Sequence, residues 1–134
     1  LFAAAADLHE TKKYYPPRYL STGATDPDDG RVNAATLLAI DGESFPAAEG
    51  CAALSAHGYD DWYLPAANEL YQLWTQRAHV PDLVMTTDWG ESAYWSSTDD
   101  TEGGADYIRF TVDGDGNIGR LAKSSSVNVR CVRR

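Results

Sequence analysis

The clearest hydrophobic pattern lies in the last third of the chain, where apolar residues occupy every second position. Ile108, Phe110 and Val112 follow this spacing, which predicts a strand with one buried face. The sequence DGDGN at residues 113–117 comes next and predicts the turn of a hairpin. Further antiparallel strands are predicted for IGRLA at 118–122 and VNVRCV at 127–132.

Another strand is predicted over SAYWSS at residues 92–97. Neighbouring side chains of a strand point to opposite faces, so we expect Trp95 in the core and Tyr94 on the outer face. In the last predicted strand, the same alternation turns three side chains inward: Val127, Val129 and Cys131.

Two segments in the middle of the chain have helical spacing. Residues 44–59 place Ala47, Cys51 and Leu54 three or four positions apart, which predicts a helix with an inward-facing cysteine. A second helix is predicted over residues 66–77, with an inward stripe of Ala66, Leu70, Leu73, Trp74 and Arg77.

Two other segments have weaker patterns. NAATLLAI at residues 33–40 fits a helix or a strand equally well. DWYL at residues 61–64 is predicted to be a short strand that Pro65 ends, with Trp62 and Leu64 packed inside.

A chain of 134 residues has room for one domain with a core of its own. Residues 1–32 contain paired prolines and lack periodicity, so they are predicted to be an N-terminal extended or linker segment. Residues 33–134 form the predicted domain. Helices followed by a run of antiparallel strands indicate an α+β fold.

Composition excludes several kinds of partner. The net charge of −9 argues against nucleic acid, because phosphate binding depends on clustered Lys and Arg. The sequence contains no apolar run of membrane-spanning length, so no membrane insertion is predicted.

The two cysteines, Cys51 and Cys131, do not have the spacing of a zinc site or a thioredoxin-type redox pair. Both are predicted to face inward from different elements, as a helix-to-strand disulfide requires. A disulfide would place the protein in an oxidising compartment. The alternative is a pair of buried free thiols in the cytosol.

Four segments in order resemble the Lcl-type C-terminal domain family of bacterial and phage surface proteins: FPAAEGCAAL, GYDDWYLPAANEL, YWSSTDD and VNVRCVRR. The resemblance covers about residues 33–134. It implies a C-type lectin-like fold, with two helices packed on a twisted antiparallel sheet and long irregular loops. It also implies that a disulfide joins Cys51 to Cys131.

In function, the resemblance implies a non-enzymatic extracellular binding module at a cell surface or on a virion, such as an adhesin or a phage fibre tip. Its partner would be a glycan or a cell-surface protein, and the module would form a homo-oligomer, often a trimer. The alternative is a structural or assembly module of a fibre or virion that contacts mainly copies of itself.

The chain departs from the family pattern at Ala66, where related sequences often have Ser or Thr. A hydroxyl there would form a capping box with Glu69, and its loss costs about 1 kcal/mol. The sulfated polysaccharide expected for the adhesin that names the family is not expected here, because a chain of net charge −9 repels a polyanion.

No catalytic residue is predicted, because His9, His57 and His79 occur in no recognisable catalytic motif. No cofactor is predicted. Calcium remains an alternative, since two acidic segments could supply oxygen ligands, although solvated loops have the same composition. These segments contain Asp26, Asp28 and Asp29 in the first, and Asp99, Asp100, Glu102 and Asp106 in the second.

The candidate ligand site lies in the irregular segment 78–106 and the strand that follows. Sugar rings stack on aromatic side chains and form hydrogen bonds to carboxylates. An exposed Trp89 beside acids suits this chemistry, although a Trp that plugs its own loop fits the sequence too. The predicted ligand-binding residues are Trp89, Asp99, Asp100, Glu102 and Tyr107.

Overall fold

The computed structural model describes residues 1–16, 21–86, 90–101, 103–111 and 114–134. Its helices are α1 (Gly30–Leu38), α2 (Pro46–Ala52), α3 (Ala67–Thr75) and the 3-10 helix η1 (Arg77–His79). Its strands are β1 (Phe2–Ala3), β2 (Lys12–Lys13), β3 (Ala93–Asp99), β4 (Gly104–Arg109), β5 (Ile118–Ala122), β6 (Ser126–Val127) and β7 (Val132–Arg133).

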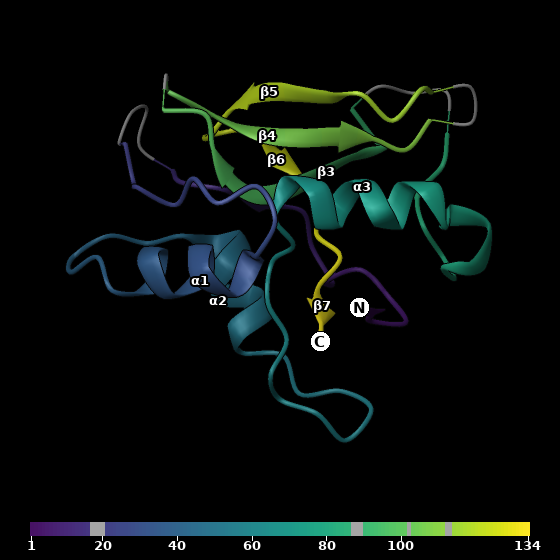
Figure 1. Cartoon of the computed structure of the whole chain (residues 1–134), viewed down its shortest axis with the longest axis horizontal. Coiled ribbons are helices and arrows are strands. Elements are labelled where there is room, and N and C mark those ends of the chain that lie inside the picture. Colours follow the sequence, from purple (N-terminus) through teal and green to yellow (C-terminus); the bar gives the residue numbers. More distant parts are fainter. Residues whose placement is uncertain (17–20, 87–89, 102, 112–113) are drawn as a thin grey trace.

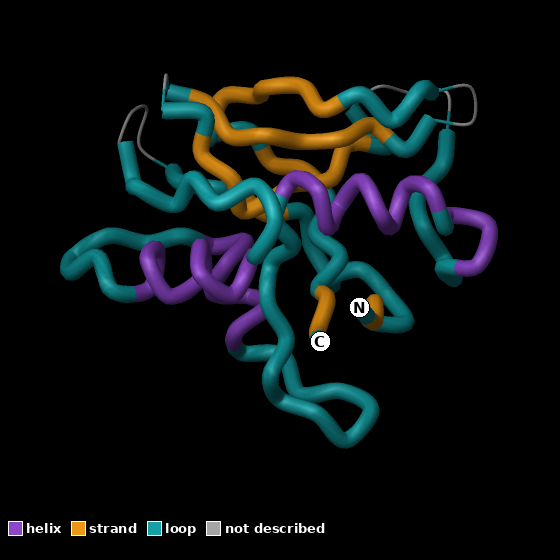
Figure 2. Tube along the Cα trace, viewed as in Figure 1, coloured by secondary structure: helices purple, strands orange, loops and turns teal. Residues whose placement is uncertain are grey.

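The largest sheet has the antiparallel order β3-β4-β5, and the short strands form two further pairs, β1-β7 and β2-β6. Figure 1 shows α3 running along the sheet, while α1 and α2 lie to one side. The strand over 92–97, the hairpin after residue 104 and the α+β class are therefore confirmed. Between the elements the chain runs through long loops, drawn teal in Figure 2.

The strand β3 is buried on both faces, which corrects the expectation for one of its aromatic residues. Trp95 packs in a core with Tyr14 and Phe45, as expected for its side of the sheet. Tyr94 was expected to face outward, but it is fully buried in a second core with Phe110 and Leu70. The second core exists because α3 covers this face of the sheet.

The helices differ from the predictions mainly at their ends. Of the segment 33–40, residues 33–38 belong to α1, and the helix ends at Leu38. It begins at Gly30 because the Asp29 carboxylate accepts a hydrogen bond from the N–H of Arg31. The helix predicted over 44–59 ends at Ala52, and the chain turns through positive φ angles at His57 and Gly58.

The prediction of a strand over 61–64 is wrong. In this segment, Tyr63 forms an isolated bridge with Val132. Trp62 and Leu64 are buried, as expected. The last predicted strand, 127–132, is divided between β6 and β7, although Val127, Val129 and Cys131 all face inward.

A hydroxyl group from strand β3 replaces the capping hydroxyl that α3 lacks at position 66. Ala66 is fully buried, and Oγ1 of Thr98 in β3 accepts the N–H of Ala67 at 3.0 Å. The Glu69 carboxylate accepts the N–H of Ala66 at 3.0 Å. The backbone N–H groups at the start of α3 are therefore bonded by Thr98 of the sheet and by Glu69 of the helix, and not by a hydroxyl at position 66.

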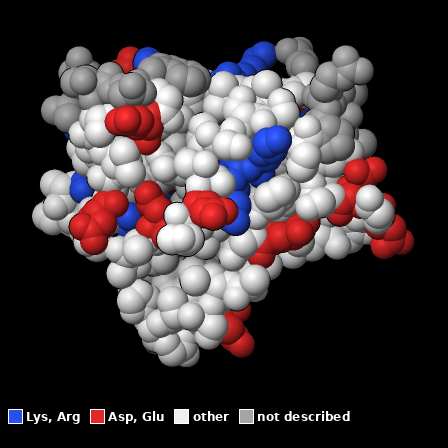
Figure 3. Space-filling view, turned by 180° about the vertical axis from the view of Figure 1, so that it is seen from behind, with Lys and Arg blue, Asp and Glu red and all other residues white. Residues whose placement is uncertain are grey.

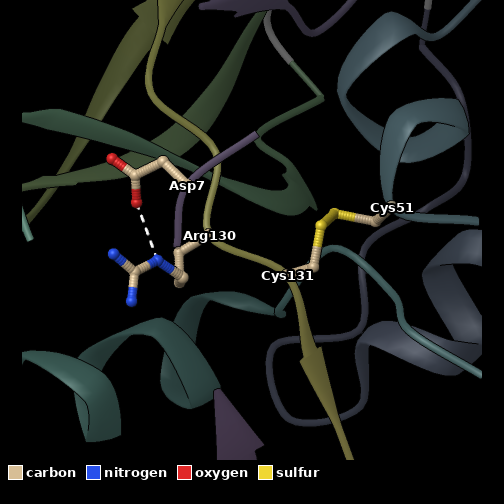
Figure 4. Close-up of a disulfide and its surroundings, with 4 residues drawn as sticks. All are labelled: Asp7, Cys51, Arg130 and Cys131. Carbon is tan, nitrogen blue, oxygen red and sulfur yellow. Dashed lines mark hydrogen bonds and ion pairs between the residues drawn. A yellow bond between two sulfur atoms is a disulfide. The ribbon is translucent and has the colours of Figure 1, made fainter. Parts of the chain in front are cut away.

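The disulfide between Cys51 and Cys131 is present, with 5.5 Å between the two Cα atoms. It joins α2 to the segment before β7 and is buried in the first core. Figure 4 shows Arg130 and Cys131 pointing in opposite directions from this segment, toward Asp7 and Cys51 respectively.

The described residues of the N-terminal segment pack against the domain, and its last three residues, 30–32, belong to α1. Nε of Arg130 lies 2.7 Å from the Asp7 carboxylate, and the other Asp7 oxygen accepts the Tyr94 hydroxyl at 2.7 Å. Tyr14 is buried and donates to the carbonyl of Ser97. Residues 4–15 therefore complete the core. No helix in the described residues is long and apolar enough to cross a membrane.

Candidate functional site

The structure separates the residues that the sequence suggested for ligand binding. Trp89 and Glu102 lie outside the described residues. Asp99 and Asp100 lie at the β3–β4 turn, whereas Tyr107 lies further along β4, beside Trp95. Of the three described residues, the two acids therefore lie at a turn and the tyrosine lies within a strand.

Asp99 is buried and forms an internal contact. One oxygen, Oδ2, accepts the N–H and hydroxyl of Thr22 and lies 2.9 Å from Nζ of Lys123. The other oxygen accepts the N–H of Thr101 at 2.8 Å. Burial by itself would raise the pKa of Asp99, but these hydrogen bonds outweigh it and lower the pKa. Asp99 therefore stabilises the turn from within.

The half-buried side chains of Asp100 and Asp106 lie near the same turn. Asp100 accepts the N–H of Gly104 at 3.0 Å and closes the turn. Burial and, to a smaller extent, the negative charges of Asp100 and Asp99 raise the pKa of Asp106 to about 6, although Arg120 acts in the opposite direction. The region is thus acidic and sensitive to pH.

The first acidic segment of the calcium hypothesis, with Asp26, Asp28 and Asp29, caps α1. The Asp26 carboxylate accepts the N–H groups of Asp28 and Asp29 at 2.8 and 2.9 Å. Asp29 pairs with Arg31, and this hydrogen bond lowers its pKa to about 2. Within the described residues, no group of three or more His, Cys, Asp or Glu side chains is placed to hold a metal ion.

Of the predicted ligand residues, Tyr107 lines a polar surface hollow. The hollow has a volume of about 190 Å³ and lies between β4, β5 and the loop that joins them. Gly119 lies opposite Tyr107 in the register, and a Cβ atom at Gly119 would come within 2.8 Å of the Tyr107 ring. The missing side chain at Gly119 therefore lets the tyrosine lie across β5 as the floor of the hollow.

Polar side chains surround this floor. Arg109, Asp115 and Asn117 are exposed at its rim. The Asp115 carboxylate accepts the backbone N–H of Asn117 at 3.0 Å and its side-chain amide at 2.7 Å. The two residues are thereby oriented by each other. The DGDGN sequence predicted the turn, but not that its side chains border a hollow.

Helix α3 fixes the loop from the other side. Gly116 has a φ of +73°, and a Cβ atom there would lie 2.5 Å from the Trp74 ring. The Arg77 guanidinium lies 4.0 Å from the centroid of the same ring. The loop backbone therefore rests against an indole that α3 holds in place, and the rim of the hollow is preorganised.

Charged side chains are dispersed on the face of the molecule shown in Figure 3. Acidic groups lie apart from one another around basic groups near the centre, and most of this face is uncharged. The net charge of −9 is therefore not gathered into one patch on the described part of this face.

Comparison with known protein families identifies the family of the chain. The model of the Lcl C-terminal domain family matches residues 20–133, which is most of the chain. No curated protein matches the chain. The matched range includes β4, β5 and the loop between them, so the hollow lies inside it.

Proposed function

The chain belongs to the Lcl C-terminal domain family, and from this premise we propose that it is a non-enzymatic extracellular module that binds a glycan. The proposed site is the polar hollow between β4 and β5. A cell-surface glycan or glycoprotein presents the neutral hydroxyl groups and C–H faces that such a site recognises. The proposed fold is a C-type lectin-like variant.

One observation carries this proposal, namely the combination of an aromatic floor with oriented polar groups. The Tyr107 side chain packs in the first core and is 9% exposed, so it offers sugar C–H groups a small apolar area at the floor of the hollow. The Asp115 carboxylate and the Asn117 amide supply an acceptor and a donor for hydroxyl groups. Because Trp74 and Gly116 hold the loop in place, little conformational entropy is lost when a ligand orders these groups.

Two further features support an extracellular binding role. A buried disulfide is typical of proteins that fold in an oxidising compartment. Figure 1 shows both ends of the chain together, on the side of α3 away from the sheet. A module attached through either end would leave the β3-β4-β5 sheet and its hollow facing outward.

The test is a glycan array probed with the intact chain, with Asn117→Ala and with Gly119→Ala. The first variant removes a rim amide, and the second adds a methyl group that meets Tyr107. Each should weaken binding about tenfold, equivalent to about 1.4 kcal/mol. The matched control is Asn68→Ala, because Asn68 is also exposed and donates its amide to a carboxylate at 2.7 Å.

Equal glycan binding by all variants would exclude the hollow as the site. Absence of any glycan response, together with stable oligomers in solution, would instead favour the assembly-module alternative. Circular dichroism of each variant checks that the fold is unchanged.

A further inference from the structure

A second surface, remote from the β3-β4-β5 sheet, has a strand with an open edge. β1 pairs with β7 in the register Phe2↔Arg133 and Ala3↔Val132. The N–H and C=O of Val132 both bond to Tyr63, at 2.9 and 2.8 Å, on the side away from β1. Val132 therefore lies between Tyr63 and β1, and β1 is the edge of this small arrangement.

The alternation of an antiparallel pair determines which backbone groups are left at the edge. The N–H of Ala4 donates to the carbonyl of Cys131 at 2.9 Å, so Ala4 faces β7. Ala3, one residue earlier, turns its N–H and C=O away from β7. In the described part of the chain, no backbone hydrogen bond outside the strand ladders reaches Ala3.

An apolar groove lies beside this edge. It has a volume of about 310 Å³, and its lining includes Phe2, Ala3, Leu73, Gln76, Val80 and Pro81. The lining contains no Asp, Glu, Lys or Arg, although the chain as a whole has a net charge of −9. Phe2 is 63% exposed at the lip, which leaves a large apolar side chain in water.

We propose that this groove binds an extended, uncharged peptide segment of a partner protein, which adds to β1 as a further strand. Main-chain hydrogen bonds from Ala3 would align the segment, and its apolar side chains would enter the groove between β1 and α3. The lining has no Asp, Glu, Lys or Arg side chain that could pair with a charged group. A charged side chain of the peptide would therefore lose hydration in the groove without gaining such a partner, so we expect an uncharged segment.

The groove also determines the shape of the partner. Its lining on the side of α3 includes Gln72 of α3, Gln76 at the C-cap of α3 and His79 of η1. An inserted strand would therefore lie between β1 and α3. The exposed amides of Gln72 and Gln76 can bond to the outer edge of the inserted strand.

The test begins with a displayed library of random heptapeptides selected on the immobilised full-length chain. Enriched sequences should be apolar and uncharged at the centre. Synthetic copies are then titrated by calorimetry against the intact chain and Ala3→Pro. Proline removes the outward N–H without breaking a bond to β7, so the peptide should bind about tenfold more weakly, or about 1.4 kcal/mol.

The matched control is Ala5→Pro, the same substitution at an exposed residue outside the groove lining. It should bind the peptide as the intact chain does, and so should Asn117→Ala, which alters only the glycan hollow. Hydrogen exchange should show slower exchange of the Ala3 amide when peptide is added.

Equal affinity for Ala3→Pro, enrichment of charged peptides or no enrichment above background would each overturn the proposal. A concentration-dependent dimer in ultracentrifugation that Ala3→Pro abolishes would also overturn it, because the occupant would then be a second copy of the chain.

Discussion

Nζ of Lys123 lies 2.9 Å from Oδ2 of Asp99, and neither side chain is exposed to solvent. Thr22 donates its N–H and its hydroxyl to the same carboxylate oxygen. This contact therefore joins the end of β3, the segment after β5 and a loop from the first part of the chain. Its members are separated by 24 and 77 positions in the sequence.

Removing the cation of this pair should strongly destabilise the fold. Lys123→Met leaves the Asp99 carboxylate buried without its ion-pair partner, and we expect the free energy of unfolding to fall by about 3–5 kcal/mol. Urea unfolding followed by circular dichroism measures the change. The matched variant Lys13→Met, at an exposed residue, should change stability by less than about 0.5 kcal/mol. An equal effect of both substitutions would contradict the role assigned to the pair.

The disulfide should supply a large share of the stability. It links residues 80 positions apart, and a loop of that length corresponds to about 4–5 kcal/mol on the chain-entropy model. The double variant Cys51→Ala, Cys131→Ala should lose about this amount in denaturant unfolding. Mass spectrometry of native protein should show a gain of two hydrogens on reduction. Free thiols in native material would remove the argument for an oxidising compartment.

Thr98 should stabilise α3 although it belongs to a strand. Its hydroxyl accepts the N–H of Ala67 and donates to the carbonyl of Asp26. Thr98→Val removes the acceptor of the Ala67 N–H, whereas the carbonyl of Asp26 keeps its hydrogen bond from the Asn33 amide, and the substitution should cost about 1–2 kcal/mol. Thr75→Val removes an exposed hydroxyl that donates to the carbonyl of Gln72 and is the control, with an expected change below about 0.5 kcal/mol.

Because the pKa of Asp106 is raised in the folded state, we expect the free energy of unfolding to depend on pH. The folded state holds this proton up to about pH 6, whereas the unfolded state releases it near the ordinary value of 3.8. Stability therefore falls as pH rises between these values, because the folded state binds more protons. Asp106→Asn removes the cost of an ionised carboxylate at this half-buried position. The variant should be more stable than the intact chain by on the order of 1 kcal/mol at about pH 7, because partial solvation weakens the electrostatic interactions of Asp106.

At about pH 3 the two proteins should differ little, because the carboxyl group is protonated in both states. Urea unfolding at both pH values measures the difference. A gain of the same size at both would show that the asparagine acts through packing and not through the charge.

Gly116 should be required for the shape of the glycan hollow. Gly116→Ala places a methyl group 2.5 Å from the Trp74 ring at a φ of +73°, which favours glycine. We expect a loss of about 1–2 kcal/mol of stability and weaker glycan binding. Indole fluorescence should report the displaced Trp74, and unchanged fluorescence with unchanged binding would contradict the contact.

The parts of the fold that the sequence predicted are those that depend on local pattern. The alternation at Ile108 and Phe110 predicted β4, and DGDGN predicted the turn before β5. The inward cysteines and the resemblance predicted the disulfide. Each of these predictions depends on a pattern within a few residues or on the order of a few short segments, both of which can be read from the sequence.

Contacts between distant segments were not predictable in this way. Tyr94 is buried because α3 covers its face of the sheet, and no local alternation shows this. Tyr14 completes the core from a segment without periodicity. Residues 62–64 look like a strand because they are apolar and aromatic, and they are buried, yet of these residues only Tyr63 forms a bridge, with Val132.

The candidate site was predicted only in part, for the same reason. Tyr107 lines the hollow as a predicted ligand residue, but Asp99 was chosen as a surface acid and is a buried partner of Lys123. A carboxylate that pairs with a lysine 24 positions later has no local signature. Gly119 and Asp115 acquire their significance from the register of β4 with β5.

The position of the disulfide has a mechanical consequence for the proposed role outside the cell. A tensile load applied between the two ends would pass along the chain to Cys51, cross the sulfur–sulfur bond and leave through Cys131. Residues 52–130, which include α3 and the whole β3-β4-β5 sheet, lie outside this covalent load path. Stretching would peel away the first part of the chain, while the hollow between β4 and β5 would bear no direct tension.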